Sequence, residues 1–239
     1  MLEFLKNHLF DSIFDYIIVA ALTWVITDWK RIFTRLQAVI HWKTDYRVSL
    51  AYLFRIKIDN KYLLIKGNRI EQFQPVGGVY KYHESFKDTY NTLGLRPENN
   101  SSFYEENDLR LFVKGKNLNK LLSWFESKKN REVTVIREFK EELIDSHIFD
   151  EDLLKKTDFE FLKQINKGIH YSTHFHCKEV LIFDIYDVLF QNDSVKDLIK
   201  TGANRCDSII LAGSEDINRE CIDICGKSFK IGAHAKYIE

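Results

Sequence analysis

Three carboxylates stand close together in the segment Arg137-Glu138-Phe139-Lys140-Glu141-Glu142-Leu143. On a helix, Glu138, Glu141 and Glu142 occupy positions i, i+3 and i+4, so they share one face. Like charges at that spacing repel each other. A hard divalent cation such as Mg²⁺, which prefers oxygen ligands, would relieve the repulsion. The competing interpretation is a solvated charged helix, which is the commonest fate of such a run.

A glycine pair stands well upstream, in Pro75-Val76-Gly77-Gly78. The acidic segment resembles the second half of the Nudix box, and the glycine pair resembles the turn that precedes this box in Nudix proteins. The resemblance implies an α/β/α sandwich with Mg²⁺ held by Glu138, Glu141 and Glu142. It also suggests Gly77, Gly78 and Arg137 as ligand-binding residues.

The loop chemistry of the Nudix box is missing from this chain. Ser123 and Lys129 stand where the family has its first glycine and its first glutamate, and Ile144 replaces the closing glycine. The acidic residues that would hold a metal are therefore present, but the glycines and the first glutamate of the family pattern are not. A Nudix fold follows from the resemblance, but Nudix hydrolysis does not.

The elements that must position these residues are of mixed α and β type. Apolar alternation and β-branched or aromatic residues predict strands, and a helical pattern surrounds the acidic run. We expect strands over 47–58, 62–66, 109–113, 159–165, 169–176 and 180–189, a glycine turn within 72–79, helices over 119–126 and 132–144, and a helix start at 214–216. Residues 80–130 look like an insertion into the domain.

An aromatic cluster lies in the strand predicted for residues 169–176. His174 and His176 point to one face of such a strand, as a metal pair would, but no third ligand is near in sequence. We therefore favour a role in a ligand cleft or on the surface. Together with His170, Tyr171 and Phe175 they could stack on a base, and core packing of the same rings is an equal alternative.

The N-terminus carries an apolar run, Ile13–Ile26, in which Asp15 is the sole charge. The run is shorter than the roughly 20 residues that span a bilayer, but flanking apolar residues extend it. We interpret it as a transmembrane helix, with a buried core helix as the alternative. Lipid-facing candidates are Ile13, Ile17, Leu22, Trp24 and Ile26.

Basic residues after this run set the expected orientation. Lys30, Arg31, Arg35 and Lys43 follow it, whereas only Lys6 precedes it. The positive-inside rule then predicts a single-pass inner-membrane protein whose C-terminal domain is cytoplasmic.

Residues 31–45 read as a basic juxtamembrane linker helix. An apolar stripe at helical spacing consists of Ile32, Leu36, Val39 and Ile40. The stripe could lie on lipid headgroups, pack against the domain or pack against another copy of the chain. We therefore divide the chain into an anchor segment (1–30), this linker (31–45) and a Nudix-like domain (46–239).

Composition fits an anchored globular domain. Hydrophobic residues make up 45% of the chain, which predicts a packed interior. The formal net charge is zero, which argues against a general DNA-binding protein. The four cysteines form no CxxC pair and are expected to be free thiols.

A membrane helix joined to a Nudix-like domain with an incomplete box resembles the transmembrane Nudix effectors of bacterial cyclic-oligonucleotide-based antiphage signalling (CBASS). In those systems a nucleotidyltransferase makes the activating cyclic nucleotide. The resemblance implies that the domain senses a cyclic oligonucleotide, that the protein assembles into a homo-oligomer, and that it disrupts the inner membrane to stop infected growth. The alternatives are a membrane-tethered, Mg²⁺-dependent hydrolase of nucleoside-diphosphate derivatives and an interaction module.

Overall fold

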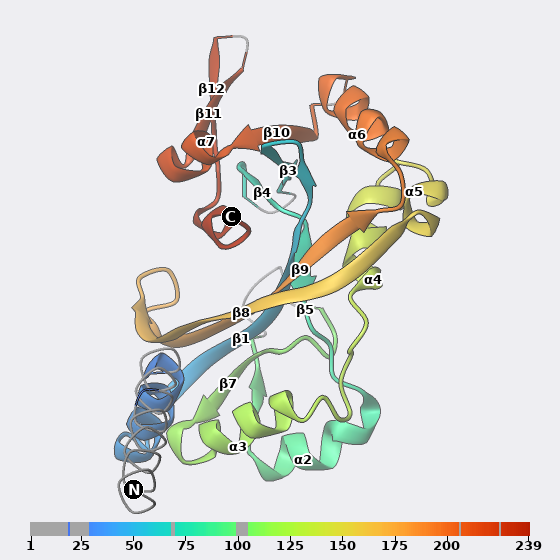
Figure 1. Ribbon diagram of the computed structural model, residues 1–239. Helices are drawn as coiled ribbons and strands as arrows, with labels where there is room; N and C mark the ends of the chain where they lie inside the picture. Colours follow the sequence, from blue (N-terminus) through green and yellow to red (C-terminus); the bar gives the residue numbers. More distant parts are fainter. Residues whose placement is uncertain (1–18, 20–28, 68–69, 99–104, 206, 225) are drawn as a thin grey trace, which may run out of the picture.

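The computed structural model describes residue 19 and residues 29–67, 70–98, 105–205, 207–224 and 226–239. In this part of the chain, long strands cross the middle of the molecule, and helices and shorter strands gather at both ends (Figure 1). The result is a mixed α/β fold.

The larger sheet is built around β1 (Asp45–Arg55), and its strand order is β6–β7–β1–β9–β8, with β5 also paired to β1. Its other members are β5 (Gly77–Val79), β6 (Arg96–Pro97), β7 (Arg110–Lys114), β8 (Thr157–Ser172) and β9 (Cys177–Phe190). β1 is parallel to β9 and antiparallel to β5 and β7. β8 and β9 form a long antiparallel hairpin. Central β1 is therefore covered on both faces, and its inner residues are all buried.

A smaller sheet stands at one end, with the order β10–β3–β2 and with β4 paired to β3. Its strands are β2 (Lys57–Ile58), β3 (Lys61–Lys66), β4 (Phe73–Pro75) and β10 (Ile209–Gly213). β11 (Cys221–Ile224) and β12 (Lys227–Lys230) form a separate hairpin nearby (Figure 1). β4 and β5 are separated by a single residue, so the glycine turn passes from one sheet to the other.

Helices lie around these sheets. They are η1 (Glu84–Phe86), α2 (Lys87–Thr92), α3 (Gly115–Glu126), α4 (Ile136–Phe139), η2 (Lys140–Ile144), α5 (Glu151–Lys155), α6 (Asp193–Arg205), α7 (Ser214–Arg219) and η3 (Ala233–Tyr237). α4 runs directly into η2, which is a π-helical turn in which the N–H of Asp145 bonds to the carbonyl of Lys140. Phe139 packs on Phe54 of β1 and on Phe159 of β8, with ring centroids 5.5 and 5.0 Å away. The acidic helix is thus fixed to the larger sheet.

Two sequence predictions about element bounds are wrong. The acidic helix was predicted from Glu132, but it begins at Ile136, because the chain before it is extended and the N–H of Glu132 bonds to the carbonyl of Lys81. The strands predicted for 159–165 and 169–176 are one strand, β8, which ends at Ser172. Residues 173–176 form the turn of the hairpin.

The predicted insertion, 80–130, contributes directly to the larger sheet. It supplies β7, in which Leu111 pairs with Val48 of β1. It also supplies α3. Leu118, Leu121 and Phe125 of α3 are buried in the core.

The predicted transmembrane segment, Ile13–Ile26, falls outside the described residues except for Val19, which is helical and exposed. Within the described part of the chain, no helix has the length and apolar character needed to cross a membrane.

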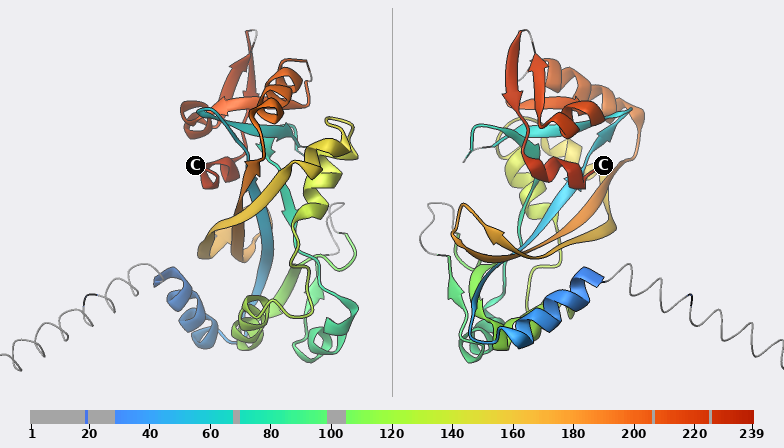
Figure 2. Two further views of the ribbon diagram at one scale, coloured as in Figure 1. Left: turned by 45° about the vertical axis from the view of Figure 1, so that its right-hand side comes forward. Right: turned by 90° about the vertical axis from the view of Figure 1, so that its left-hand side faces the viewer.

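Residues 29–40 are helical, and β1 begins at Asp45. The helix lies beside α3 and below the β8–β9 hairpin (Figure 2). Arg35 bonds to both carboxylate oxygens of Glu126, at 2.9 and 3.0 Å, and to the hydroxyl of Ser123. The polar side of this helix is therefore bonded to α3.

Candidate functional site

A polar cavity of about 250 Å³ lies between the acidic helix and the glycine turn. All three predicted carboxylates, Glu138, Glu141 and Glu142, line it, and so do Gly77 and Gly78. Its remaining lining residues are Gln74, Glu105, Asp108 and Arg110. The fold thus brings the two sequence motifs together, and it adds two acids from the segment before β7.

The glycines allow this close approach. A Cβ atom at Gly78 would overlap the carboxyl group of Glu138, and one at Gly77 would overlap the backbone carbonyl of Tyr52. Gly77 also has a φ of +153°, and its N–H donates to a carboxylate oxygen of Glu142 at 2.8 Å. The turn therefore needs glycine at both positions, and one box carboxylate is occupied in holding it.

Arg137 neutralises much of the acidic helix. Its guanidinium donates to Glu138 at 2.7 Å, to Glu141 at 3.2 Å and to Glu132 at 3.0 Å. It also donates to the carbonyl of Val79 at 2.9 Å. Burial alone would lower the pKa of Arg137, but hydrogen bonds and the charges of these acids raise it above its usual value. The bond to Val79 ties the helix to β5. Arg137 itself lines neither this cavity nor the second one described below.

Glu138 is the most perturbed of the carboxylates. Burial raises its pKa from 4.5 to about 7, against the opposing effect of the Arg137 charge. Glu138 therefore changes charge near neutral pH, whereas an ordinary glutamate would be fully ionised there.

We predict that the Glu138→Gln variant becomes increasingly more stable than the wild type as pH rises. Between pH 4.5 and 7 the folded state holds a proton on Glu138 that the unfolded chain has lost, so wild-type stability falls across that window. Glutamine imitates the protonated form, and its advantage should grow by on the order of 2–3 kcal/mol between pH 5 and 8. Denaturant unfolding at several pH values measures this difference. Glu141→Gln, at a more exposed side chain, is the control. If the wild type instead gains stability over Glu138→Gln as pH rises, the attraction of Arg137 would outweigh burial in setting the pKa of Glu138.

The predicted Mg²⁺ ligands have protein partners in this structure. Among the described residues, no three His, Cys, Asp or Glu side chains converge closely enough to hold a metal ion. Glu138 and Glu141 bond to Arg137, and Glu142 bonds to the backbone of Gly77. The three carboxylates share a cavity but are directed to protein partners.

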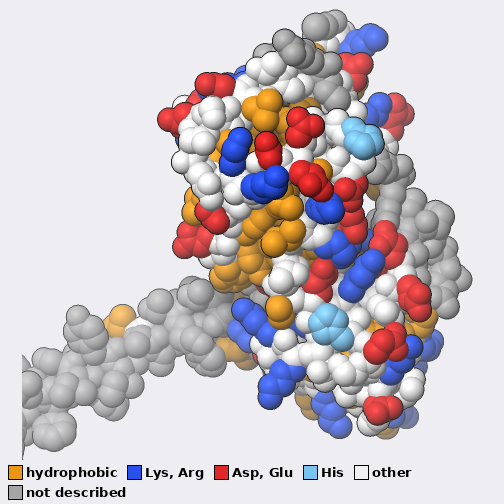
Figure 3. Space-filling model, turned by 90° about the vertical axis from the view of Figure 1, so that its right-hand side faces the viewer, with side chains coloured by type: hydrophobic (Ala, Val, Ile, Leu, Met, Phe, Trp, Pro, Cys, Tyr) orange, Lys and Arg blue, Asp and Glu red, His pale blue; other side chains and the backbone are white. Residues whose placement is uncertain are grey.

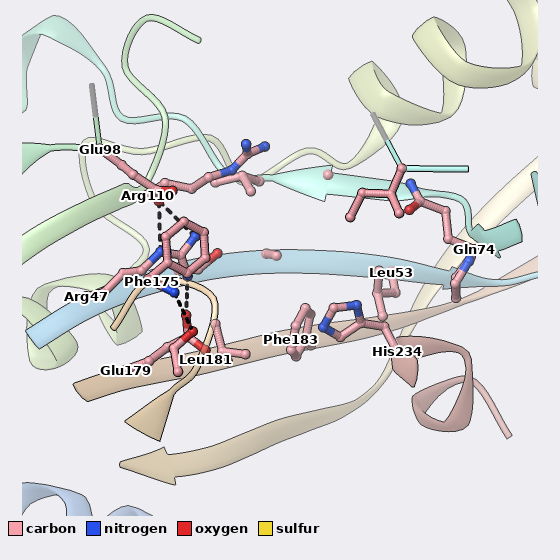
Figure 4. A pocket seen from close by; sticks show the side chains of 18 residues that line it. Arg47, Leu53, Gln74, Glu98, Arg110, Phe175, Glu179, Leu181, Phe183 and His234 are labelled. Carbon is pink, nitrogen blue, oxygen red and sulfur yellow. Dashed lines mark hydrogen bonds and ion pairs between the residues drawn. The ribbon is translucent and has the colours of Figure 1, made fainter. Parts of the chain in front are cut away.

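A second cavity, of about 360 Å³, adjoins the first (Figure 4). Gln74, Gly77, Gly78 and Arg110 line both cavities. The walls of the second one are mostly apolar. They include Ala51 and Leu53 of β1, Leu181 and Phe183 of β9, and His234 of η3. These strand residues alternate with the core-facing ones, so one face of β1 and β9 forms the cavity and the other forms the core.

A buried ion cluster closes one end of this apolar cavity (Figure 4). Arg47 donates to Glu98 at 2.8 Å and to Glu179 at 2.6 Å. The ring of Phe175 lies over the guanidinium, 3.8 Å away. The second oxygen of Glu179 is 3.0 Å from Nε2 of His170. One cation thus serves two buried carboxylates, and His170 provides a further partner for one of them.

The predicted histidine pair does not lie on a strand. His174 and His176 are exposed on the turn between β8 and β9, and neither lines a cavity described here. The strand ends at Ser172 because the hairpin must turn, and His176 adopts a φ of +51° in that turn. Between the two histidines, Phe175 points back into the apolar cavity.

Sequence reasoning missed Arg47, Glu98 and Glu179 as site residues. The available signal was a charged residue within a strand of mostly apolar residues, which holds for Arg47 and Glu179. On the face shown in Figure 3, basic and acidic side chains of the described residues are interspersed. That face therefore carries neither a uniformly positive nor a uniformly negative patch.

Comparison with known proteins gives one match. The model of a family described as SMODS-associated NUDIX domain matches residues 45–239. Neither the curated proteins nor the solved structures contain a significant match.

Proposed function

Because the chain belongs to the SMODS-associated NUDIX domain family, we propose that it is a membrane-anchored effector whose Nudix-like domain binds a cyclic oligonucleotide. Family membership supports a link to CBASS-type antiphage systems. In this proposal the domain has the α/β/α architecture of Nudix proteins and follows a transmembrane helix at Ile13–Ile26.

The pair of adjoining cavities is the observation that carries the proposal. The apolar one falls within the range of about 300–1,000 Å³ that small-molecule sites occupy. It offers Phe175 and Phe183 as aromatic walls for a base. The polar cavity holds five carboxylates and would repel a phosphate. We therefore place a base in the apolar cavity and direct the phosphodiester to Arg110, on the boundary between the two.

Three features favour binding over hydrolysis. Arg137 and Gly77 bond to the box carboxylates, and burial raises the pKa of Glu138, which disfavours the ionised form that a metal would need. Lys129 and Ile144 replace the glutamate and glycine of the family pattern. The competing hydrolase has its own support, because Glu138, Glu141 and Glu142 do share one cavity.

The ligand would act through assembly. A ligand that binds only the assembled protein shifts the equilibrium toward it, and clustered N-terminal helices would then breach the inner membrane. Asp15 is costly against lipid but tolerable inside such a cluster.

Calorimetry on the full-length protein in detergent tests the receptor directly. Against a panel of cyclic di- and trinucleotides, we expect at least one to bind with a dissociation constant of roughly micromolar or tighter and to raise the melting temperature. If no member of the panel gives heat or a melting shift, the receptor proposal fails. Mg²⁺-dependent phosphate release that disappears in the Glu141→Gln, Glu142→Gln double variant would establish the hydrolase instead.

Phe175→Ala should weaken binding of that nucleotide. Stacking of a base on an aromatic ring is worth about 1–3 kcal/mol, so we expect affinity to fall roughly 5- to 150-fold. Tyr171→Ala is a matched control, because Tyr171 lies on the same hairpin, is exposed and does not line the cavity. Equal affinity in the two variants would place the base elsewhere.

A further inference from the structure

The helix over residues 29–40 turns its polar and small side chains toward the protein. Thr34 and Ala38 are fully buried. Arg35 is held by Glu126 and Ser123 of α3. A Cβ atom at Gly115 would overlap the carbonyls of Ala38 and His41, so the helix end approaches α3 very closely.

The opposite side of this helix is apolar and faces outward. Six large apolar side chains of the helix, and Trp42 in the turn just after it, are between 38% and 62% exposed: Trp29, Ile32, Phe33, Leu36, Val39, Ile40 and Trp42. A surface helix of a water-soluble domain normally has the reverse arrangement, with its apolar stripe toward the core. A contiguous apolar stripe of this kind marks an interaction surface.

Charge and sequence context indicate which partner covers it. Lys30 and Lys43 flank the stripe and are exposed, and the ammonium of Lys43 lies 4.9 Å from the ring of Trp42. Tryptophans stand at both ends of the stripe, as they do at membrane–water interfaces. A second copy of the helix would bring like charges together, whereas anionic headgroups attract them. The apolar run Ile13–Ile26 also lies directly upstream in the sequence.

We infer that residues 29–42 lie in the plane of the membrane surface, with this apolar stripe in the lipid and the domain held against the bilayer through α3. The inference rests on the membrane-anchored effector proposed above. It adds that the domain is docked on the lipid and does not hang free from its anchor.

Docking would also bear on the nucleotide site. A Cβ atom at Gly168 of β8 would lie 3.7 Å from the hydroxyl of Thr34, so the hairpin rests beside the helix. The turn of the same hairpin carries Phe175. A helix fixed in the bilayer therefore contacts the element that closes the apolar cavity.

Fluorescence of Trp42 in proteoliposomes tests the docking. In full-length protein carrying Trp24→Phe and Trp29→Phe, only Trp42 and Trp124 remain, and Trp124 is stacked on Phe86. Surface helices bury their apolar face about 5–10 Å into the headgroup boundary, so shallow brominated lipids should roughly halve the Trp42 emission. A further Trp42→Phe change should leave emission that these lipids do not quench.

Variants and parallel binding measurements separate the outcomes. Leu36→Gln with Val39→Gln should abolish the quenching, whereas Leu198→Gln, an exposed leucine on α6, should not. Trp42 emission that is insensitive to brominated lipid overturns docking, and concentration-dependent cross-linking through the helix would then identify a second copy as the partner. If brominated lipid quenches Trp42 but calorimetry detects no cyclic nucleotide, only the receptor proposal is refuted. If a nucleotide binds but Trp42 is not quenched, only the docking of the helix is refuted.

Discussion

Replacing Arg47 with methionine should lower the free energy of unfolding by about 3–5 kcal/mol, because it leaves two buried carboxylates without their cation. The side chains of Glu98 and Glu179 are only 5% and 7% exposed. Both would have to stay ionised in a poorly hydrated site or take up protons, and either course costs stability. Equilibrium denaturant unfolding of the detergent-solubilised protein, followed by circular dichroism, measures the loss.

Arg55→Met is the matched control for this experiment. Arg55 stands on the same strand and pairs with Asp187 at 2.7 Å, but both side chains are more than one-fifth exposed. Such a pair is worth about 1 kcal/mol or less. Adding Glu98→Gln and Glu179→Gln to Arg47→Met should restore much of the lost stability, because the unpaired charges disappear. Equal losses from Arg47→Met and Arg55→Met would show that the cluster is hydrated and that its burial has little energetic weight.

The parts of the fold that the sequence predicted are those that local patterns determine. Alternating and apolar runs indicated β1, β3 and β9. Gly77 and Gly78 could be singled out because the pair resembles the turn that precedes the box in Nudix proteins. Even so, their contact with Glu138 became visible only in three dimensions.

The ion cluster could not be predicted, because its members are far apart along the chain. Arg47 lies 51 residues from Glu98 and 132 residues from Glu179. The parallel register of β1 and β9 sets Arg47 opposite Glu179, and the pairing of β6 with β7 and of β7 with β1 brings Glu98 to the same place. Nothing in the local sequence specifies that register, because it depends on the whole sheet.

The placement of His174 and His176 on a strand was wrong for a related reason. Period-2 alternation through residues 169–176 does not reveal where a strand ends, and the pairing of Ser172 with Cys177 closes the hairpin before the histidines. The start of the acidic helix was misplaced because tertiary contacts overrode its helical pattern. The carboxylate of Glu132 bonds to the side chain of Arg137 and to the N–H of Lys81, which holds this residue in an extended segment.

Introducing charge into the predicted anchor should abolish toxicity in cells. We expect co-expression of the wild type with its cognate nucleotide synthase to depolarise the inner membrane, as a potential-sensitive dye would report. Ile17→Arg with Leu22→Arg places two charges where each costs about 2.5–3.5 kcal/mol at a helix centre, so the segment should no longer insert. The double variant should therefore leave the membrane polarised. Nucleotide binding by the purified variant is the control and should be unchanged, because neither residue belongs to residues 45–239, which the family model matches.

Asp15→Leu separates insertion from assembly. Asp15 is the only charge in the run Ile13–Ile26, so its removal should favour insertion, and the variant should still fractionate with the membrane. If the carboxylate faces the interior of a helix cluster, depolarisation should weaken although the protein remains anchored. Full toxicity in Asp15→Leu would mean that the carboxylate only reaches the lipid interface. Toxicity from a chain lacking residues 1–30 would exclude membrane disruption by the predicted anchor, because that segment would be absent, and the hydrolase would then be the stronger hypothesis.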